Sequence, residues 1–160
     1  MDHNMFCFQC EQTAGCTGCT SRGVCGKDAQ TAQAQDRLTG ALIGLARAAD
    51  TSPDAGPETW QLMIEGLFAT LTNVNFDPDS LNALAGRVRA EKQRLVPDCA
   101  VCTAPCGRTG DYDLAQLWGA QEDIRSLKSL LLFGSRGMAA YAYHAMVLGY
   151  RDESVERFLS

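Results

Sequence analysis

The sequence predicts an all-α fold, an antiparallel bundle of helices that carries two cysteine-rich loops. Apolar residues recur at helical spacing over most of residues 28–159, and no stretch alternates apolar and polar residues as a half-buried strand does. Cysteines concentrate instead in two short segments without this period, residues 7–25 and 99–106. We therefore expect one structural domain, in which a cysteine-rich segment (1–27) packs on a helical bundle (28–160).

The first helix is predicted to follow Asp28, which suits the N-cap position. Its apolar residues keep the spacing of one helix face: Leu38, Ala41, Leu42, Leu45, Ala46 and Ala49. The segment TSPDAG (51–56) has the composition of a turn, and Pro57 suits the first position of a second helix.

The second helix carries Trp60, Ile64, Leu67, Phe68 and Leu71, and NVNFDPDS (73–80) ends it. A third helix is predicted to begin near Asp79 or Ser80 and to stop at Pro97. It offers the core Leu81, Leu84, Val88 and Leu95, while its charged face, RVRAEKQR (87–94), is typical of a solvated surface.

Helical spacing resumes at Leu114 and continues through one long segment, in Ile124, Leu127, Leu130, Leu131, Met138, Tyr141, Ala145 and Leu148. Gly134 and Gly137 lie inside it, where each costs about 1 kcal/mol relative to alanine and permits either close packing or a break. A last helix opens at Asp152-Glu153 and meets no stop signal before Ser160. We therefore expect the chain to be part of a longer one.

The net charge and the distribution of apolar residues bear on which partners the protein can bind and where in the cell we expect it. The formal net charge of −5, without a cluster of Lys or Arg, argues against nucleic acid. No basic region followed by an apolar run opens the chain, as a signal peptide would require, and the most apolar later segment is too polar for a membrane span. We expect a soluble, cytoplasmic protein, in which eight cysteines indicate metal binding more than crosslinks.

The first cysteine segment leaves three kinds of site open. Its thiols are Cys7, Cys10, Cys16, Cys19 and Cys25. Zinc would take four thiolates in a tetrahedron, and the two closely spaced pairs Cys7-x-x-Cys10 and Cys16-x-x-Cys19 offer them. An iron–sulfur cubane needs a chain that wraps around a wider object, which the neighbouring glycines favour. A disulfide scaffold is the third reading, and the lack of a signal peptide disfavours it.

The residues MFCFQCEQTA and TGCTSRGVCGK resemble the N-terminus of the hybrid cluster proteins, also called prismane proteins or hydroxylamine reductases. The resemblance continues through GLFATLTNVNFD and through DLAQLWGAQEDIRSLKSLLLFGSRGMAAYAYHAMVLGY. It implies that a Cys-x2-Cys-x8-Cys-x5-Cys pattern holds a [4Fe-4S] cubane near the surface. In this sequence that pattern falls on Cys7, Cys10, Cys19 and Cys25, and Cys16 is left over.

The same resemblance implies what this chain lacks. Family members are several times longer, and His, Glu and Cys residues of their later domains hold a catalytic hybrid [4Fe-2S-2O] cluster. His3 and His144 are the only histidines here, and neither matches such a ligand. We expect His3 to be solvated and His144 to be a hydrogen-bonded core residue. No catalytic residue is predicted on this chain.

The second cysteine loop offers Cys99, Cys102 and Cys106 within eight residues. Three thiolates could hold zinc or part of a cluster with a fourth ligand from elsewhere, for which Cys16 is a candidate. The favoured alternative is that they are reduced cysteines that pack against the bundle, because the triplet lacks a fourth ligand of its own.

Two functions follow. The first is a [4Fe-4S] electron-transfer domain of a hydroxylamine-reductase-like oxidoreductase, which accepts electrons from a donor protein and passes them to the remaining domains for reduction of hydroxylamine or nitric oxide. Alone, such a chain should not turn over substrate. The second is a zinc-stabilised helical interaction module with Cys7, Cys10, Cys16 and Cys19 as ligands.

Overall fold

The computed structural model describes residues 5–10, 17–97 and 110–159, and its regular elements are all helices. In chain order they are α1 (Ala29–Thr51), α2 (Pro57–Ala69), α3 (Pro78–Leu95), α4 (Leu114–Trp118), α5 (Glu122–Val147) and α6 (Glu153–Leu159). No strand occurs in the described ranges, where the only β-type pairing is an isolated bridge between Cys7 and Cys19. The predicted all-α class is confirmed for this part of the chain.

The helix starts follow local capping chemistry. The Asp28 carboxylate accepts a hydrogen bond from the Thr31 amide at 2.8 Å, which confirms the predicted N-cap of α1. α2 begins at Pro57, also as predicted. α3 begins at Pro78, slightly before the predicted start, because Asp77 caps it by accepting from the Asp79 amide.

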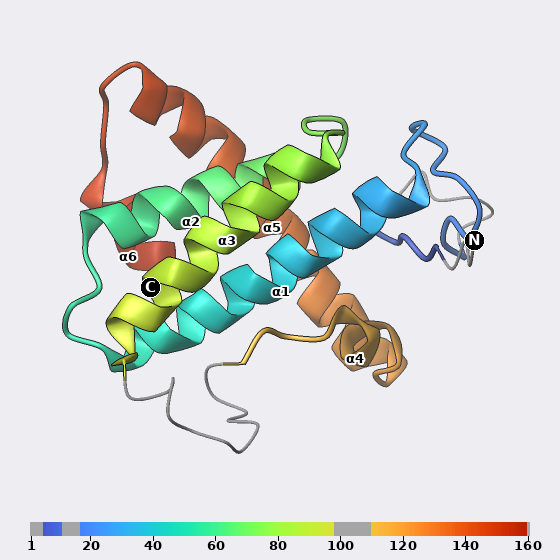
Figure 1. Cartoon of the computed structure of the whole chain (residues 1–160), viewed down its shortest axis with the longest axis horizontal. Coiled ribbons are helices and arrows are strands. Elements are labelled where there is room, and N and C mark those ends of the chain that lie inside the picture. Colours follow the sequence, from blue (N-terminus) through green and yellow to red (C-terminus); the bar gives the residue numbers. More distant parts are fainter. Residues whose placement is uncertain (1–4, 11–16, 98–109, 160) are drawn as a thin grey trace.

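The core lies between α1, α2 and α3. Figure 1 shows α1 and α3 side by side and running in the same direction, with α2 running back along them. Apolar side chains at the predicted positions fill this interface, among them the fully buried Leu38, Leu45, Leu81 and Val88. The charged face of α3 is solvated as predicted, and it carries surface ion pairs such as Arg87–Glu65 and Lys92–Asp111.

The predicted long helix from Leu114 is wrong in one respect, because the chain breaks between α4 and α5. Gly119 caps the end of α4, and α5 starts after Gln121. Gly134 and Gly137 neither break α5 nor serve close packing, since a Cβ atom on either would meet nothing within 4 Å. The break therefore lies at Gly119, which the sequence pattern had placed inside one continuous helix.

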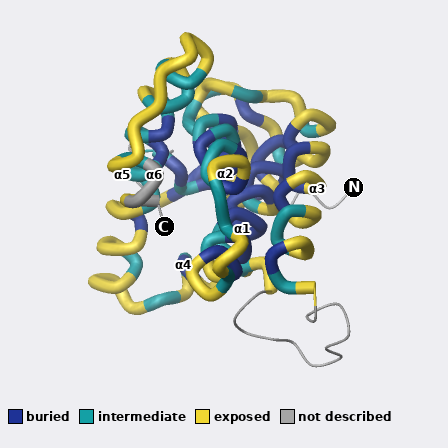
Figure 2. The backbone as a smooth tube through the Cα atoms, turned by 90° about the vertical axis from the view of Figure 1, so that its left-hand side faces the viewer, coloured by how far each residue is buried: buried dark blue, intermediate teal, exposed yellow. Residues whose placement is uncertain are grey.

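α5 crosses behind α2 in Figure 1, and few of its residues are buried. Figure 2 shows long stretches of exposed residues along it. Its buried residues are Ser129, Arg136 and Ala139, whereas Leu127, Leu130 and Leu131 are each more than 60% exposed. Within the described residues, no helix is both long enough and apolar enough to cross a membrane.

Candidate functional site

Two of the predicted ligands, Cys7 and Cys19, are held opposite each other at one end of α1. The Cys7 amide donates to the Cys19 carbonyl at 2.9 Å, and the Cys19 amide donates to the Cys7 carbonyl at 2.8 Å. Directly opposed residues of an antiparallel pair have Cβ atoms about 4.5–5.5 Å apart. Both cysteines are buried, so this bridge presents two sheltered thiols on a fixed backbone.

The other two predicted ligands, Cys10 and Cys25, are half-buried. Cys25 lies in a tight turn, where the Gly26 amide donates to the Gly23 carbonyl at 2.8 Å and Gly26 has a φ of 91°. A Cβ atom on Gly23 would lie 3.1 Å from Cys25 Sγ. A glycine therefore leaves room for this sulfur to pack against the backbone.

Aromatic and polar contacts anchor the N-terminal segment to the helices. The rings of Phe6 and Phe8 each meet Trp118 of α4 edge to face, with centroids 5.7 Å apart. Gln9 Nε2 donates to Asp36 Oδ1 of α1 at 2.6 Å, and Thr72 donates to the Gln9 carbonyl at 3.4 Å. The segment is thus tied to α4, α1 and the α2–α3 connection.

Two buried cations, Lys27 and Arg136, interact electrostatically with Cys7. Lys27 is 2% exposed, and its ammonium lies 3.8 Å from Cys7 Sγ and donates to the side-chain oxygen of Gln35. Arg136 of α5 is also 2% exposed, and it donates to the hydroxyls of Thr70 and Thr39 at 3.0 and 2.9 Å. The hydrogen-bond partners of both cations are neutral side chains, so burial favours a negative charge nearby.

The charges of this region influence one another. Burial raises the pKa of the Cys7 thiol, an effect that the Lys27 ammonium opposes. Burial also raises the pKa of Asp36 to about 6, against the hydrogen bond from Gln9 and the charge of Arg136. Burial lowers the pKa of Arg136 to about 10, although the charges of Asp36 and Cys7 favour the guanidinium.

Two buried polar atoms near the cysteines have no hydrogen-bond partner in the described part of the chain, Gln9 Oε1 and Arg136 Nη1. Buried donors and acceptors are normally satisfied, so such atoms indicate a site that is completed by something else. The thiol of Cys7, which interacts with two buried cations, suits an anionic, thiolate-bound group. In their chemistry the residues therefore fit an iron–sulfur cluster.

The structure does not gather these sulfurs around a single point. Within residues 5–10, 17–97 and 110–159, no three Cys, His, Asp or Glu side chains are grouped closely enough to hold one metal ion. A cubane does not need its ligands around one point, because each of its four irons binds a separate thiolate. The ligand set Cys7, Cys10, Cys19 and Cys25 stays a prediction. Cys16 and the second-loop cysteines Cys99, Cys102 and Cys106 lie outside the described residues.

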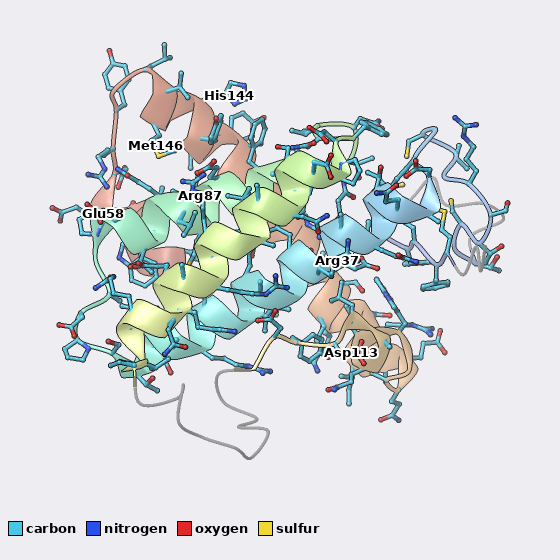
Figure 3. All side chains as sticks on the ribbon, viewed as in Figure 1. Arg37, Glu58, Arg87, Asp113, His144 and Met146 are labelled. Carbon is cyan, nitrogen blue, oxygen red and sulfur yellow. The ribbon has the colours of Figure 1, made fainter. Side chains whose placement is uncertain are left out.

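The histidine prediction was wrong for His144, and His3 is outside the described residues. His144 is exposed near the C-terminal end of α5, away from the N-terminal segment, as Figure 3 shows. Its Nδ1 atom lies 2.6 Å from the Ala140 carbonyl, and its ring meets Phe68 edge to face. Its hydrogen bond is thus local to the helix, and it lies on a surface rather than in a core.

Sequence reasoning missed the polar residues behind the cysteines: Lys27, Gln35, Asp36 and Arg136. Arg136 had a detectable signal, because it falls between Leu132 and Ala139 at the spacing of one helix face, where a charge is unexpected. Lys27 had none, since it adjoins a predicted N-cap where a solvated lysine is ordinary.

A shallow cavity of about 610 Å³ opens beside the segment between α1 and α4. Phe6 and Trp118 form its apolar part, while Arg37 and Asp113, labelled in Figure 3, belong to its polar lining. This cavity gives the aromatic anchor of the segment partial contact with solvent.

Comparison with known proteins identifies a protein family and several relatives that are similar to the chain. Residues 5–160 match the Prismane/CO dehydrogenase family. Hydroxylamine reductases of Desulfitobacterium hafniense and Clostridium perfringens are each 39% identical to the chain over 98% of its length, and that of Methanococcus vannielii is 36% identical over 97%. The chain spans about a third of these relatives, 32% in each case.

Proposed function

The chain belongs to the Prismane/CO dehydrogenase family, and from this premise we propose that it is a [4Fe-4S]-binding electron-transfer domain of a hydroxylamine-reductase-like oxidoreductase. The observation that carries the proposal is the pairing of Cys7 with Cys19 beside the buried Lys27. A pair of sheltered thiols facing a buried cation is suited to an anionic group bound through thiolates.

In this proposal Cys7, Cys10, Cys19 and Cys25 are the four ligands, one for each iron. When bound, the cluster supplies one-electron transfer. The protein's residues do the rest: the Cys7–Cys19 bridge fixes two sulfurs, Gly23 leaves space beside Cys25, and Trp118 holds the segment on the helices. Because Cys10 and Cys25 are only half-buried, they would leave one side of the cluster accessible to a donor protein.

We assign the chemistry of the substrate to the part of the relatives that this chain does not span. Reduction of hydroxylamine or nitric oxide would take place there, and the present chain would deliver electrons without turnover of its own. The exposed apolar residues of α5, including Leu127 and Leu131, suit contact with those remaining domains.

Anaerobic purification tests the proposal. We expect a brown protein that contains iron and acid-labile sulfide in equal amounts, with a visible absorption band that bleaches on reduction by dithionite. A colourless protein with one zinc ion would instead support the interaction module and overturn the electron-transfer function.

Single cysteine variants test the ligand set. Cys19→Ser and Cys25→Ser should each lose the colour and most of the iron, because each removes one thiolate. Cys16→Ser is the matched control and should keep both. A Cys16→Ser protein without iron, together with a Cys25→Ser protein that retains it, would contradict the assignment.

A further inference from the structure

We infer that the Lys27 ammonium is the charge partner of the Cys7 thiolate, held in place by Gln35, and that it raises the reduction potential of the cluster. This inference rests on the proposed function, since it concerns how the same site is tuned. It concerns residues for which neither the sequence pattern nor the family comparison gave a role. Lys27 and Gln35 act here as positioning residues through Cys7.

Within the described residues, the Lys27 ammonium donates to Cys7 Sγ at 3.8 Å and to the Gln35 side-chain oxygen, and it also interacts with the charge of Asp36. Gln35 is fixed in turn, because its Nε2 donates to the Asn75 carbonyl at 2.9 Å. That bond turns the amide oxygen of Gln35 toward Lys27. The α2–α3 connection thus orients a glutamine on α1, which orients the lysine toward the sulfur.

Burial makes this arrangement informative. Lys27 is 2% exposed and Gln35 is 1% exposed, so neither reaches bulk water. A buried ammonium is costly unless an opposite charge compensates it. The Asp36 carboxylate supplies one opposite charge, but it also faces Arg136, so the two buried cations leave one positive charge uncompensated. A neutral glutamine and a neutral thiol would not balance that charge, whereas a Cys7 thiolate bound to iron would. The position of Lys27 is therefore explained by a cysteine that functions as an anion.

The same contact has a direct effect on electron transfer. Reduction adds one electron to the cluster without forming or breaking a bond to the protein, and it increases the negative charge on the sulfurs. A fixed positive charge and an N–H donor directed at one sulfur stabilise the reduced state more than the oxidised state. Removal of that charge should lower the reduction potential.

A simple structural role of Lys27 predicts a different result. Its backbone carbonyl accepts a hydrogen bond from the Gly23 amide at 2.8 Å, which helps to shape the turn that carries Cys25. Substitution of the side chain leaves this backbone bond available. If only the bond matters, side-chain variants should keep the wild-type potential.

The experiment is a potentiometric titration of the anaerobically purified protein, followed by electron paramagnetic resonance, with dithionite as the electron source. Lys27→Met keeps the length of the side chain and removes its charge. We expect its potential to fall by at least 59 mV, which is a tenfold change in the equilibrium constant for a one-electron couple. Lys128→Met on the exposed surface of α5 is the matched control and should keep the wild-type potential.

Gln35→Glu provides a second route that keeps the lysine and the volume. The new carboxylate would pair with the ammonium and offset its charge, so the potential should fall here too. This variant decides the matter if Lys27→Met does not fold.

The two proposals fail in different ways. A wild-type protein without iron and sulfide would overturn the proposed function and this inference together. A wild-type cluster whose potential is unchanged in Gln35→Glu and in any folded Lys27→Met protein would overturn this inference alone.

Discussion

At the scale of single residues, Asp36 is the clearest case of a side chain whose charge depends on its surroundings. It lies half-buried between Gln9 and the cations Arg136 and Lys27. Burial outweighs these favourable partners and raises the pKa of its carboxyl to about 6, well above the ordinary value for an aspartate. Near neutral pH the folded protein therefore holds a carboxylate that would be more stable in water.

The sign of the pH dependence follows from this shift. A carboxyl whose pKa is higher in the folded than in the unfolded state stabilises the fold fully below the unfolded value, and that stabilisation is lost as pH rises through the folded value. Between pH 5.5 and 7.5 the free energy of unfolding should fall by about 1 kcal/mol for this reason. Asp36→Asn, which cannot ionise, should lack this component.

Chemical denaturation of both proteins at several pH values under anaerobic conditions measures the difference. The stability of the wild type relative to Asp36→Asn should rise as the pH is lowered. Parallel stability curves for the two proteins would show that Asp36 is not responsible.

Residue types were only partly predictable from the sequence. The cysteine-rich segment stood out through its spacing, and the family resemblance selected four ligands from it, of which the structure pairs Cys7 with Cys19. Lys27 and Arg136 were not recognised, because their importance arises from burial by segments far apart in the chain. Arg136 donates hydrogen bonds to Thr70 and Thr39, which lie 66 and 97 positions earlier in the sequence. A local helical period does not reveal contacts over such separations.

At the scale of elements, capping residues and prolines in the sequence predicted the helix starts well. Asp28, Pro57 and Asp152 mark the starts of α1, α2 and α6 in the structure, because capping depends on neighbouring residues alone. The break at Gly119 was missed, since leucines and alanines keep helical spacing on both sides of it. Periodicity identifies a helix more reliably than it identifies a short interruption.

Two glycines in helix interiors should respond to alanine in opposite directions. A Cβ atom on Gly40 of α1 would lie 2.3 Å from the Tyr112 carbonyl oxygen, and the Tyr112 amide donates to the Gly40 carbonyl at 3.0 Å. Gly40→Ala must displace that backbone segment, so we expect it to lower the free energy of unfolding by about 1–3 kcal/mol. Gly134→Ala meets open space and should raise it by up to about 1 kcal/mol.

Thermal unfolding of the two variants and the wild type provides the comparison. Gly134 serves as the control for the intrinsic preference of a helix for alanine. A Gly40→Ala protein as stable as Gly134→Ala would mean that residues 110–112 do not pack closely on α1.

At the scale of the whole molecule, the apolar surface is unevenly covered. The core between α1, α2 and α3 is closed, whereas α5 leaves leucines such as Leu127 and Leu131 exposed. The sequence predicted α5 from these leucines but could not show which side another element covers. A helical period reports that a face is apolar, and burial depends on the rest of the assembly.

This surface should make the 160-residue chain self-associate. Leu127 and Leu131 are 63% and 69% exposed, and burial of one leucine stabilises by about 1.5–3 kcal/mol. The double substitution Leu127→Gln and Leu131→Gln should therefore weaken association at least about tenfold, since 1.4 kcal/mol corresponds to a factor of ten. Its melting temperature should change little.

Sedimentation velocity over a range of protein concentrations measures this association. Ala83→Gln, at an exposed position of α3, controls for the effect of an added polar side chain. Equal association of the double variant and the wild type would exclude α5 as the contact surface.

The half-buried state of Cys10 and Cys25 affects both electron exchange with a partner and the sensitivity of bound iron to air. Val24, next to Cys25, is 63% exposed, so little protein separates this turn from solvent. Whatever lets a redox partner approach also lets dioxygen and chelators reach bound iron. We expect the colour of the protein to fade quickly in air, and the shelter of Cys7 and Cys19 alone would not prevent it. Rapid electron exchange and a short aerobic lifetime would thus have one structural cause.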